Sequence, residues 1–229
     1  MKYNLIVALD FSCKSDALAL VDKLDPDSCA LKIGSEMYTS LGPSFVQELV
    51  ARRFKVFLDL KYHDIPTTVA KACAAACDLG IWMINLHASG GLKMMEAARK
   101  AVDAFGSNKP ILIAVTVLTS MQSSDLTSIG IAENLENHVG NLAKIAKSAG
   151  LDGVVSSAVE VPLIKEICGN DFLTVTPGIR LATNNSDDQE RVMTPKMALA
   201  LGSDYLVVGR PITKACDPQR AIKELFEDV

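Results

Sequence analysis

The chain has 229 residues, of which 49% are hydrophobic, so it can bury one sizeable core; one domain over residues 1–229 is expected, with two small domains as the alternative. The formal net charge of −4 excludes a strongly basic protein that would bind nucleic acid or an anionic membrane through a global positive field. Six cysteines without paired spacing, and apolar runs too short for a signal peptide or a membrane span, favour a soluble cytoplasmic protein.

Short runs rich in Val, Ile and Leu recur eight times, and each is followed by a longer stretch with a helical pattern. The predicted strands cover 4–10, 29–34, 55–61, 82–88, 111–118, 152–158, 173–179 and 205–212. The predicted helices cover 14–24, 44–53, 66–79, 91–105, 132–149, 160–168, 195–202 and 217–227. Apolar strands that alternate with helices indicate a parallel sheet, and eight such units favour a closed (β/α)₈ TIM barrel over an open doubly wound sheet.

Two connections are unusually long and polar. They cover 119–131, after the fifth predicted strand, and 181–194, after the seventh. Long loops that follow the strands of a barrel can close over a bound ligand, so we expect these two segments to act as lids.

In a (β/α)₈ barrel the reacting groups lie at the carboxyl ends of the strands, and this sequence carries its polar residues there. Those near the ends of predicted strands are Asp10, Lys32, Asp59, Lys61, His87, Thr119, Arg180 and Arg210. Charged side chains inside apolar strands are costly to bury, which disfavours the simpler interpretation as surface ion pairs.

The run DLKYHDIPTT, residues 59–68, is the most informative segment. Because side chains alternate along a strand, Asp59 and Lys61 are expected to face the same way, while Asp64 lies in the turn before a helix that starts near Pro66. Flanking carboxylates favour the ammonium form of a lysine, which is a poor Schiff-base nucleophile but a good proton donor to a carbanion. Asp59 can place negative charge beside an anionic leaving group. The run therefore predicts decarboxylation or isomerisation through a stabilised carbanion.

A phosphate site is predicted after the seventh and eighth strands, in VTPGIR and VVGRPIT. Barrels commonly bind phosphate there through backbone N–H groups and a cation. Arg180 and Arg210 are the candidate cations, since a guanidinium can hold a phosphate with two parallel hydrogen bonds. Gly209 lets the backbone approach closely.

Six segments together resemble the motifs of the orotidine 5′-monophosphate decarboxylase family, in order and with the spacing of its bacterial members. They are ALDF at 8–11, LKIG at 31–34, DLKYHDIPTT at 59–68, HASGG at 87–91, VTPGIR at 175–180 and VVGRPIT at 207–213. The resemblance covers nearly the whole chain, and the D-x-K-x-x-D-I-P-x-T run is its most specific part.

The resemblance implies a reaction: decarboxylation of orotidine 5′-monophosphate to UMP and CO₂ in de novo pyrimidine biosynthesis, with no cofactor and no metal. It implies that Lys61 donates a proton to C6 of the pyrimidine and that Asp59 lies beside the departing CO₂. Lys32 and Asp64 complete the implied catalytic set.

The resemblance also implies how the substrate is bound. The ribose is expected to contact Asp10, together with Asp64 and Thr68 contributed across the interface of a homodimer. Lys32 is also expected to bind the substrate. Thr119 is expected to contact the pyrimidine. The residues implied for the phosphate and its loop are Arg180, Gln189, Gly209 and Arg210.

Two alternatives remain open at this point. Magnesium-dependent relatives on the same barrel, the 3-keto-gulonate-phosphate decarboxylase and hexulose-phosphate synthase group, also carry a D-x-K-x-x-D run, but they hold the metal with an acid where this chain has Lys32, whose charge repels a cation. A non-catalytic nucleotide-binding protein is the other alternative, and it would be expected to have a broken charged set. His63 and His87 lie near the expected mouth and are interpreted as structural, because the carbanion mechanism needs no histidine base.

Overall fold

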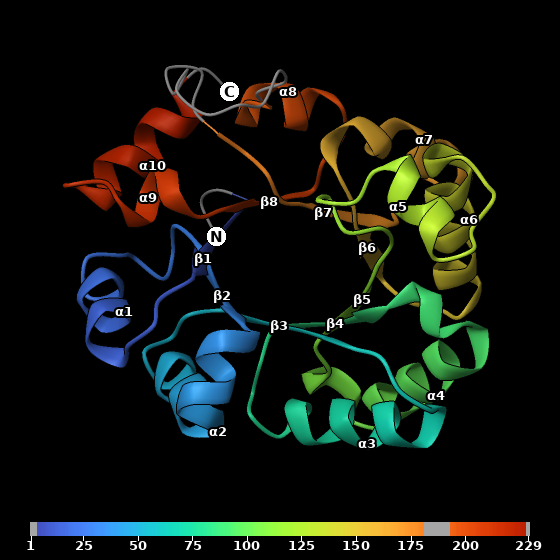
Figure 1. Cartoon of the computed structure of the whole chain (residues 1–229). Coiled ribbons are helices and arrows are strands. Elements are labelled where there is room, and N and C mark those ends of the chain that lie inside the picture. The colour runs from blue at the N-terminus through green and yellow to red at the C-terminus, as the bar shows by residue number, and fades with distance from the viewer. Residues whose placement is uncertain (1–3, 181–192, 228–229) are drawn as a thin grey trace.

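Parallel strands close into a barrel with helices around its outside (Figure 1). The computed structural model describes residues 4–180 and 193–227. The strands are β1 (Leu5–Leu9), β2 (Ala30–Gly34), β3 (Val56–Tyr62), β4 (Met83–His87), β5 (Ile111–Val115), β6 (Gly153–Val155), β7 (Leu173–Thr176) and β8 (Tyr205–Val208). Each strand pairs with the next, and β8 pairs with β1. The predicted (β/α)₈ TIM barrel is therefore confirmed, and the open doubly wound sheet is excluded.

The helices follow the strands along the chain. They are α1 (Lys14–Val21), α2 (Ser35–Ala51), α3 (Pro66–Cys77), α4 (Leu92–Asp103), α5 (Ser123–Ser128), α6 (Leu135–Ser148), α7 (Val161–Cys168), α8 (Pro195–Ala200), α9 (Arg210–Thr213) and α10 (Pro218–Phe226), with single 3₁₀ turns η1 (Ala88–Gly90), η2 (Gly106–Asn108) and η3 (Ala158–Glu160). Among the described residues, none of these helices has the length and apolar character needed to cross a membrane.

Four predicted strands extend too far at their carboxyl ends. The fifth ends at Val115 rather than 118, the sixth at Val155 rather than 158, the seventh at Thr176 rather than 179, and the eighth at Val208 rather than 212. Apolar residues continue past each end for other reasons. Val117 packs in the loop after β5, and Ile212 is buried on helix α9, where the prediction had strand.

Helix α2 and the segment 119–131 also differ from the prediction. α2 consists of two helical stretches that meet at a kink at Gly42 and Pro43, and the predicted start at 44 marks only the second of them. Gly42 takes the positive φ of 66° that glycine allows. The first predicted lid, 119–131, contains the short helix α5. Most of the second, 181–194, lies outside the described residues.

An apolar floor fills the inside of the barrel beneath the site. Its buried residues are Ile6, Ala8, Ala30, Phe57, Met83, Ile113, Val175 and Val207. Side chains alternate along a strand, so the next inward positions above Ala8, Ala30 and Phe57 are Asp10, Lys32 and Asp59. A larger cluster lies between the strands and the helices. The sheet thus carries its charged side chains directly above an apolar core.

Candidate active site

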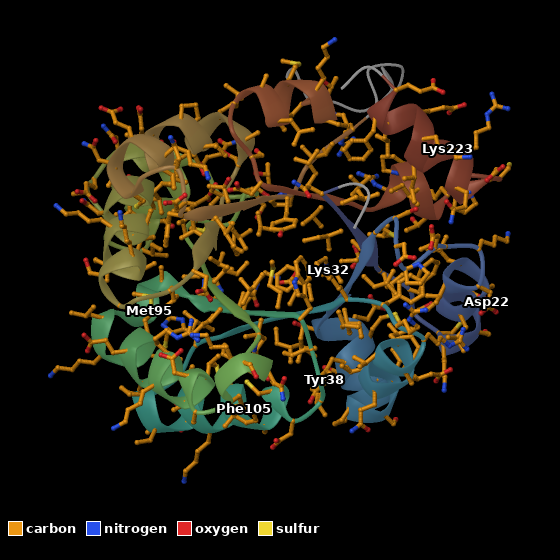
Figure 2. The ribbon with its side chains drawn as sticks, turned by 180° about the vertical axis from the view of Figure 1, so that it is seen from behind. Asp22, Lys32, Tyr38, Met95, Phe105 and Lys223 are labelled. Carbon is orange, nitrogen blue, oxygen red and sulfur yellow. The ribbon has the colours of Figure 1, made fainter. Side chains whose placement is uncertain are left out.

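A cavity of about 310 Å³ opens at the carboxyl ends of the strands, the size of a small-molecule site. Its lining consists of Ala8, Asp10, Lys32, Phe57, Asp59, Lys61, Val115, Val117, Leu118, Thr119, Val155, Pro177, Gly178, Val207 and Gly209. The wall formed by β1, β2 and β3 carries the charges, whereas the wall formed by β5 and β6 is mainly apolar. Figure 2 shows Lys32 inside the ring of strands.

Four charged side chains of the first wall form a row of alternating sign, which we call the charged array: Asp10, Lys32, Asp59 and Lys61. The Nζ atom of Lys32 lies 3.4 Å from Oδ1 of Asp10 and 3.2 Å from Oδ2 of Asp59. The Nζ atom of Lys61 lies 2.8 Å from Oδ1 of Asp59. Asp59 is therefore held between two ammonium groups.

Asp59 is the most buried member of the array, with 7% of its surface exposed. Burial alone raises the pKa of a carboxyl, but the charges of Lys32 and Lys61 and the hydrogen bonds from Lys61 and Asn85 outweigh it, so the pKa of Asp59 lies below its usual value. The site therefore keeps a buried negative charge at neutral pH. A ligand group that approaches Asp59 meets that charge in an environment where water screens it little.

Strand β3 is irregular where it carries the array. Leu58 pairs with Ile84 and Tyr62 pairs with Leu86, so three residues of β3 lie opposite the single residue Asn85. Within this bulge Lys61 has a φ of 53°, in the left-handed region that costs a residue with a Cβ about 1–2 kcal/mol. Asp59 and Lys61 face the same cavity, as expected, although the backbone between them does not follow a regular strand.

Asn85 is the site residue that the sequence analysis missed. It is fully buried on β4, and its Nδ2 donates to Oδ1 of Asp59 at 2.6 Å. Its Oδ1 accepts the backbone N–H of Lys61 at 2.8 Å. The one available signal was an amide within the apolar run WMINLHA, two residues before His87.

Asp64 and Thr68 do not join this cavity. Both are exposed, on the connection from β3 and the first turn of α3, which begins at Pro66 close to the predicted start. Oδ1 of Asp64 accepts the backbone N–H of Ile65 at 2.6 Å. The structure of one chain therefore separates these two residues from Asp59 and Lys61.

The residues predicted to contact the pyrimidine and the phosphate fall into three groups by their position relative to the cavity. Thr119 and Gly209 line the cavity. Arg180 and Arg210 follow β7 and β8 but are not among the lining residues; Arg180 is half-buried, and Arg210 is the exposed first residue of α9. Gln189 lies outside the described residues.

His63 and His87 lie beside one another near the end of β4, with ring centroids 5.6 Å apart. Burial is the largest cause of a lowered pKa for His87. The nearby His63 and Lys61 lower this pKa further, while the charge of Asp59 acts in the opposite direction. His87 is thus favoured in its neutral form. Neither histidine is among the residues that line the cavity.

The barrel and the charged cavity at the carboxyl ends of its strands define an enzyme of the (β/α)₈ class. Residues 3–225 match the family described as "Orotidine 5′-phosphate decarboxylase / HUMPS family", and the chain belongs to that family.

Relatives and a solved structure agree with this assignment along the whole chain. A protein named orotidine 5′-phosphate decarboxylase from Legionella pneumophila (strain Corby) is 59% identical over 229 residues, which covers 100% of both chains. One of the same name from Vibrio cholerae serotype O1 is 56% identical, covering 97% of this chain and 96% of the relative. The crystal structure of orotidine 5′-phosphate decarboxylase from Lactobacillus acidophilus matches with a TM-score of 0.87 and 38% identity, covering 97% of each chain.

Proposed function

We propose that this protein converts orotidine 5′-phosphate to UMP and CO₂ in de novo pyrimidine biosynthesis, without a cofactor. The observation that carries the proposal is Asp59 held between Lys32 and Lys61 in the cavity. The names of the relatives described above support the choice of substrate. We also propose a cytoplasmic location, because the cysteines are free thiols, as in a reducing compartment.

The array can carry the reaction as a direct decarboxylation. The bond between C6 and the carboxylate breaks, CO₂ leaves, and the electron pair remains on C6. The ammonium of Lys61 stabilises the developing charge and donates its proton to C6, after which solvent returns a proton to the lysine. Asp59 places negative charge beside the substrate carboxylate, a repulsion that is relieved as neutral CO₂ forms.

The remainder of the substrate is proposed to bind around the array. Asp10 is proposed to contact the ribose and Thr119 the pyrimidine, and Lys32 is proposed as a further substrate contact. For the phosphate we propose Arg180, Gln189, Gly209 and Arg210. Contacts this far from C6 can contribute to catalysis if they are used to position the reacting carbon against Lys61.

A homodimer is part of the proposal, with Asp64 and Thr68 completing the cavity of the partner subunit. Both are exposed and lie outside their own chain's cavity. Ile65, which follows Asp64, is 63% exposed, and Leu92 at the start of α4 is 42% exposed. Helices α3 and α4 pack side by side, so this surface offers apolar side chains next to the two polar ones, as a subunit interface requires (Figure 1).

The charge of Lys32 distinguishes this proposal from the metal-dependent alternative. Its ammonium lies within 3.4 Å of Asp10 and 3.2 Å of Asp59, where it opposes binding of a divalent cation between those carboxylates. The test is UMP formation by protein treated with EDTA and then assayed with and without Mg²⁺. Equal rates are expected; activity that disappears in EDTA and returns with Mg²⁺ would refute the cofactor-free reaction.

A further inference from the structure

We infer that Asn85 is a positioning residue for the proposed decarboxylation, in which one buried side-chain amide fixes both the carboxylate of Asp59 and the backbone of Lys61. The inference rests on the proposed function and adds to it a residue outside the cavity lining. The two hydrogen bonds, 2.6 Å to Asp59 and 2.8 Å to Lys61, leave from opposite ends of the same amide. Neither the carboxylate of Asp59 nor the backbone of Lys61 can shift without losing its bond to Asn85.

The backbone of Lys61 needs such a support. Its φ of 53° is a conformation that glycine adopts freely, but a glycine there would remove the ammonium that the reaction uses. The bulge in β3 also takes residues 59–61 out of the regular pairing with β4. The N–H of Lys61 instead reaches a side-chain acceptor, the Oδ1 atom of Asn85.

The carboxylate of Asp59 needs a support for a different reason. Its Oδ1 is bonded both by Lys61 and by Asn85, while its Oδ2 faces Lys32. Lysine side chains are long and flexible, so ion pairs with them fix a carboxylate only loosely. The planar amide of Asn85 extends from a strand of the barrel and is fully buried, which restricts its rotation.

The nature of the amide also matches the two tasks. An amide presents a donor and an acceptor in one plane, whereas a carboxylate in its usual form only accepts and an apolar residue does neither. Asn85 is the single residue of β4 opposite the bulge. Its place in the sheet and its chemistry therefore point to the same role.

The first test compares Asn85→Ala with a matched control, Thr174→Val. Thr174 is also fully buried on a barrel strand, and its Oγ1 donates to Asp204 at 2.9 Å, away from the cavity. We expect kcat to fall about a hundredfold in Asn85→Ala, because a small misplacement of the reacting groups lowers the rate by about that factor. The KM and the Kd for UMP should change less than about threefold, since the proposed phosphate contacts are untouched. Thr174→Val should lose stability in urea but keep kcat.

Three outcomes separate the possibilities. If wild-type protein and Thr174→Val do not turn over orotidine 5′-phosphate, the proposed function fails. If they do and Asn85→Ala keeps kcat within twofold, the positioning role fails. If kcat and UMP affinity fall together by the same factor in Asn85→Ala, the residue is structural and the positioning role is also overturned.

A second variant, Asn85→Asp, isolates the bond to Asp59. The new side chain can still accept the N–H of Lys61, but without a proton it cannot donate to Asp59. The charged and titratable groups around it are Asp59, Lys32, Lys61, His87 and, beside His87, His63, with Asp10 behind Lys32. Two facing carboxylates share a proton more readily as the pH falls.

The defect of Asn85→Asp relative to wild type should therefore shrink as the pH is lowered from about 8 to about 5.5. The measurement is kcat for both proteins across that range. A ratio that does not change with pH would overturn the role of Asn85 in orienting Asp59.

Discussion

The Nζ atom of Lys32 on β2 lies 3.2 Å from Oδ2 of Asp59 on β3. The contact joins two neighbouring strands through opposite charges directly above the apolar floor of the barrel. It also keeps a buried carboxylate ionised, because the ammonium offsets the cost of burial. The same atom of Lys32 reaches Asp10, so one lysine links the two carboxylates of the array.

Replacing Lys32 should damage catalysis more than the fold. We expect Lys32→Ala to lower kcat/KM roughly a hundred- to a thousandfold, the usual effect of removing one preorganised electrostatic group. Lys165→Ala is the matched control: Lys165 has the same 12% side-chain exposure and pairs with Asp204 at 2.6 Å, outside the cavity. Steady-state kinetics and urea unfolding check both variants. A control as inactive as Lys32→Ala would mean that lost stability explains the effect.

Arg210→Ala should weaken use of the substrate while leaving the barrel intact. A hydrogen-bonded contact to a charged group contributes about 1.5–3 kcal/mol, so kcat/KM should fall at least about tenfold. Arg220→Ala offers a control, because Arg220 is an exposed arginine of α10 paired with Glu224. The measurement is kcat/KM for orotidine 5′-phosphate in both variants and in wild type. Unchanged kinetics in Arg210→Ala would remove this residue from the proposed phosphate site.

If each active site is built from residues of both subunits, mixing two inactive variants should restore activity. Lys61→Ala and Asp64→Ala are each expected to be inactive, but a mixed dimer contains one cavity with both native residues. Activity should appear after the two proteins are unfolded together and refolded, and should follow the fraction of mixed dimer. A verified mixed dimer without activity would contradict the proposal that Asp64 serves the partner subunit.

His87 should make the free energy of unfolding decrease as the pH falls into the mildly acidic range. Its pKa is lowered in the folded protein, so the unfolded chain binds the proton first and the stabilisation is lost as the pH falls below about 6.5. The free energy of unfolding should therefore decrease from about pH 7.5 to about pH 5.5 by more in wild type than in His87→Gln. Urea titrations at both values measure this. Equal decreases would show that His87 is not the group responsible.

The strands and the charged residues could be predicted from sequence because each has a local signal. Val, Ile and Leu runs mark the strands, and a charge such as Asp59 or Lys61 inside such a run is conspicuous. The strand ends were less accurate, since apolar residues such as Ile212 continue into a helix that packs on the core. Local patterns do not record which element buries an apolar side chain.

The role of Asn85 and the backbone of Lys61 had no such signal. A positive φ at a lysine depends on a bulge, and the bulge depends on how β3 aligns with β4. That alignment is a property of the closed sheet and not of either segment alone. A single asparagine in an apolar strand gains meaning only when its partners, 24 and 26 residues away, are placed beside it.

The central claim is that Lys61 drives a metal-independent decarboxylation. The most direct measurement follows the loss of orotidine 5′-phosphate by absorbance, in EDTA, with wild-type protein and with Lys61→Ala. We expect turnover by wild type and a rate at least about a hundredfold lower in Lys61→Ala, the range expected for loss of a general acid. Equal rates in the two proteins, or no turnover by folded wild-type protein, would rule out this role of Lys61.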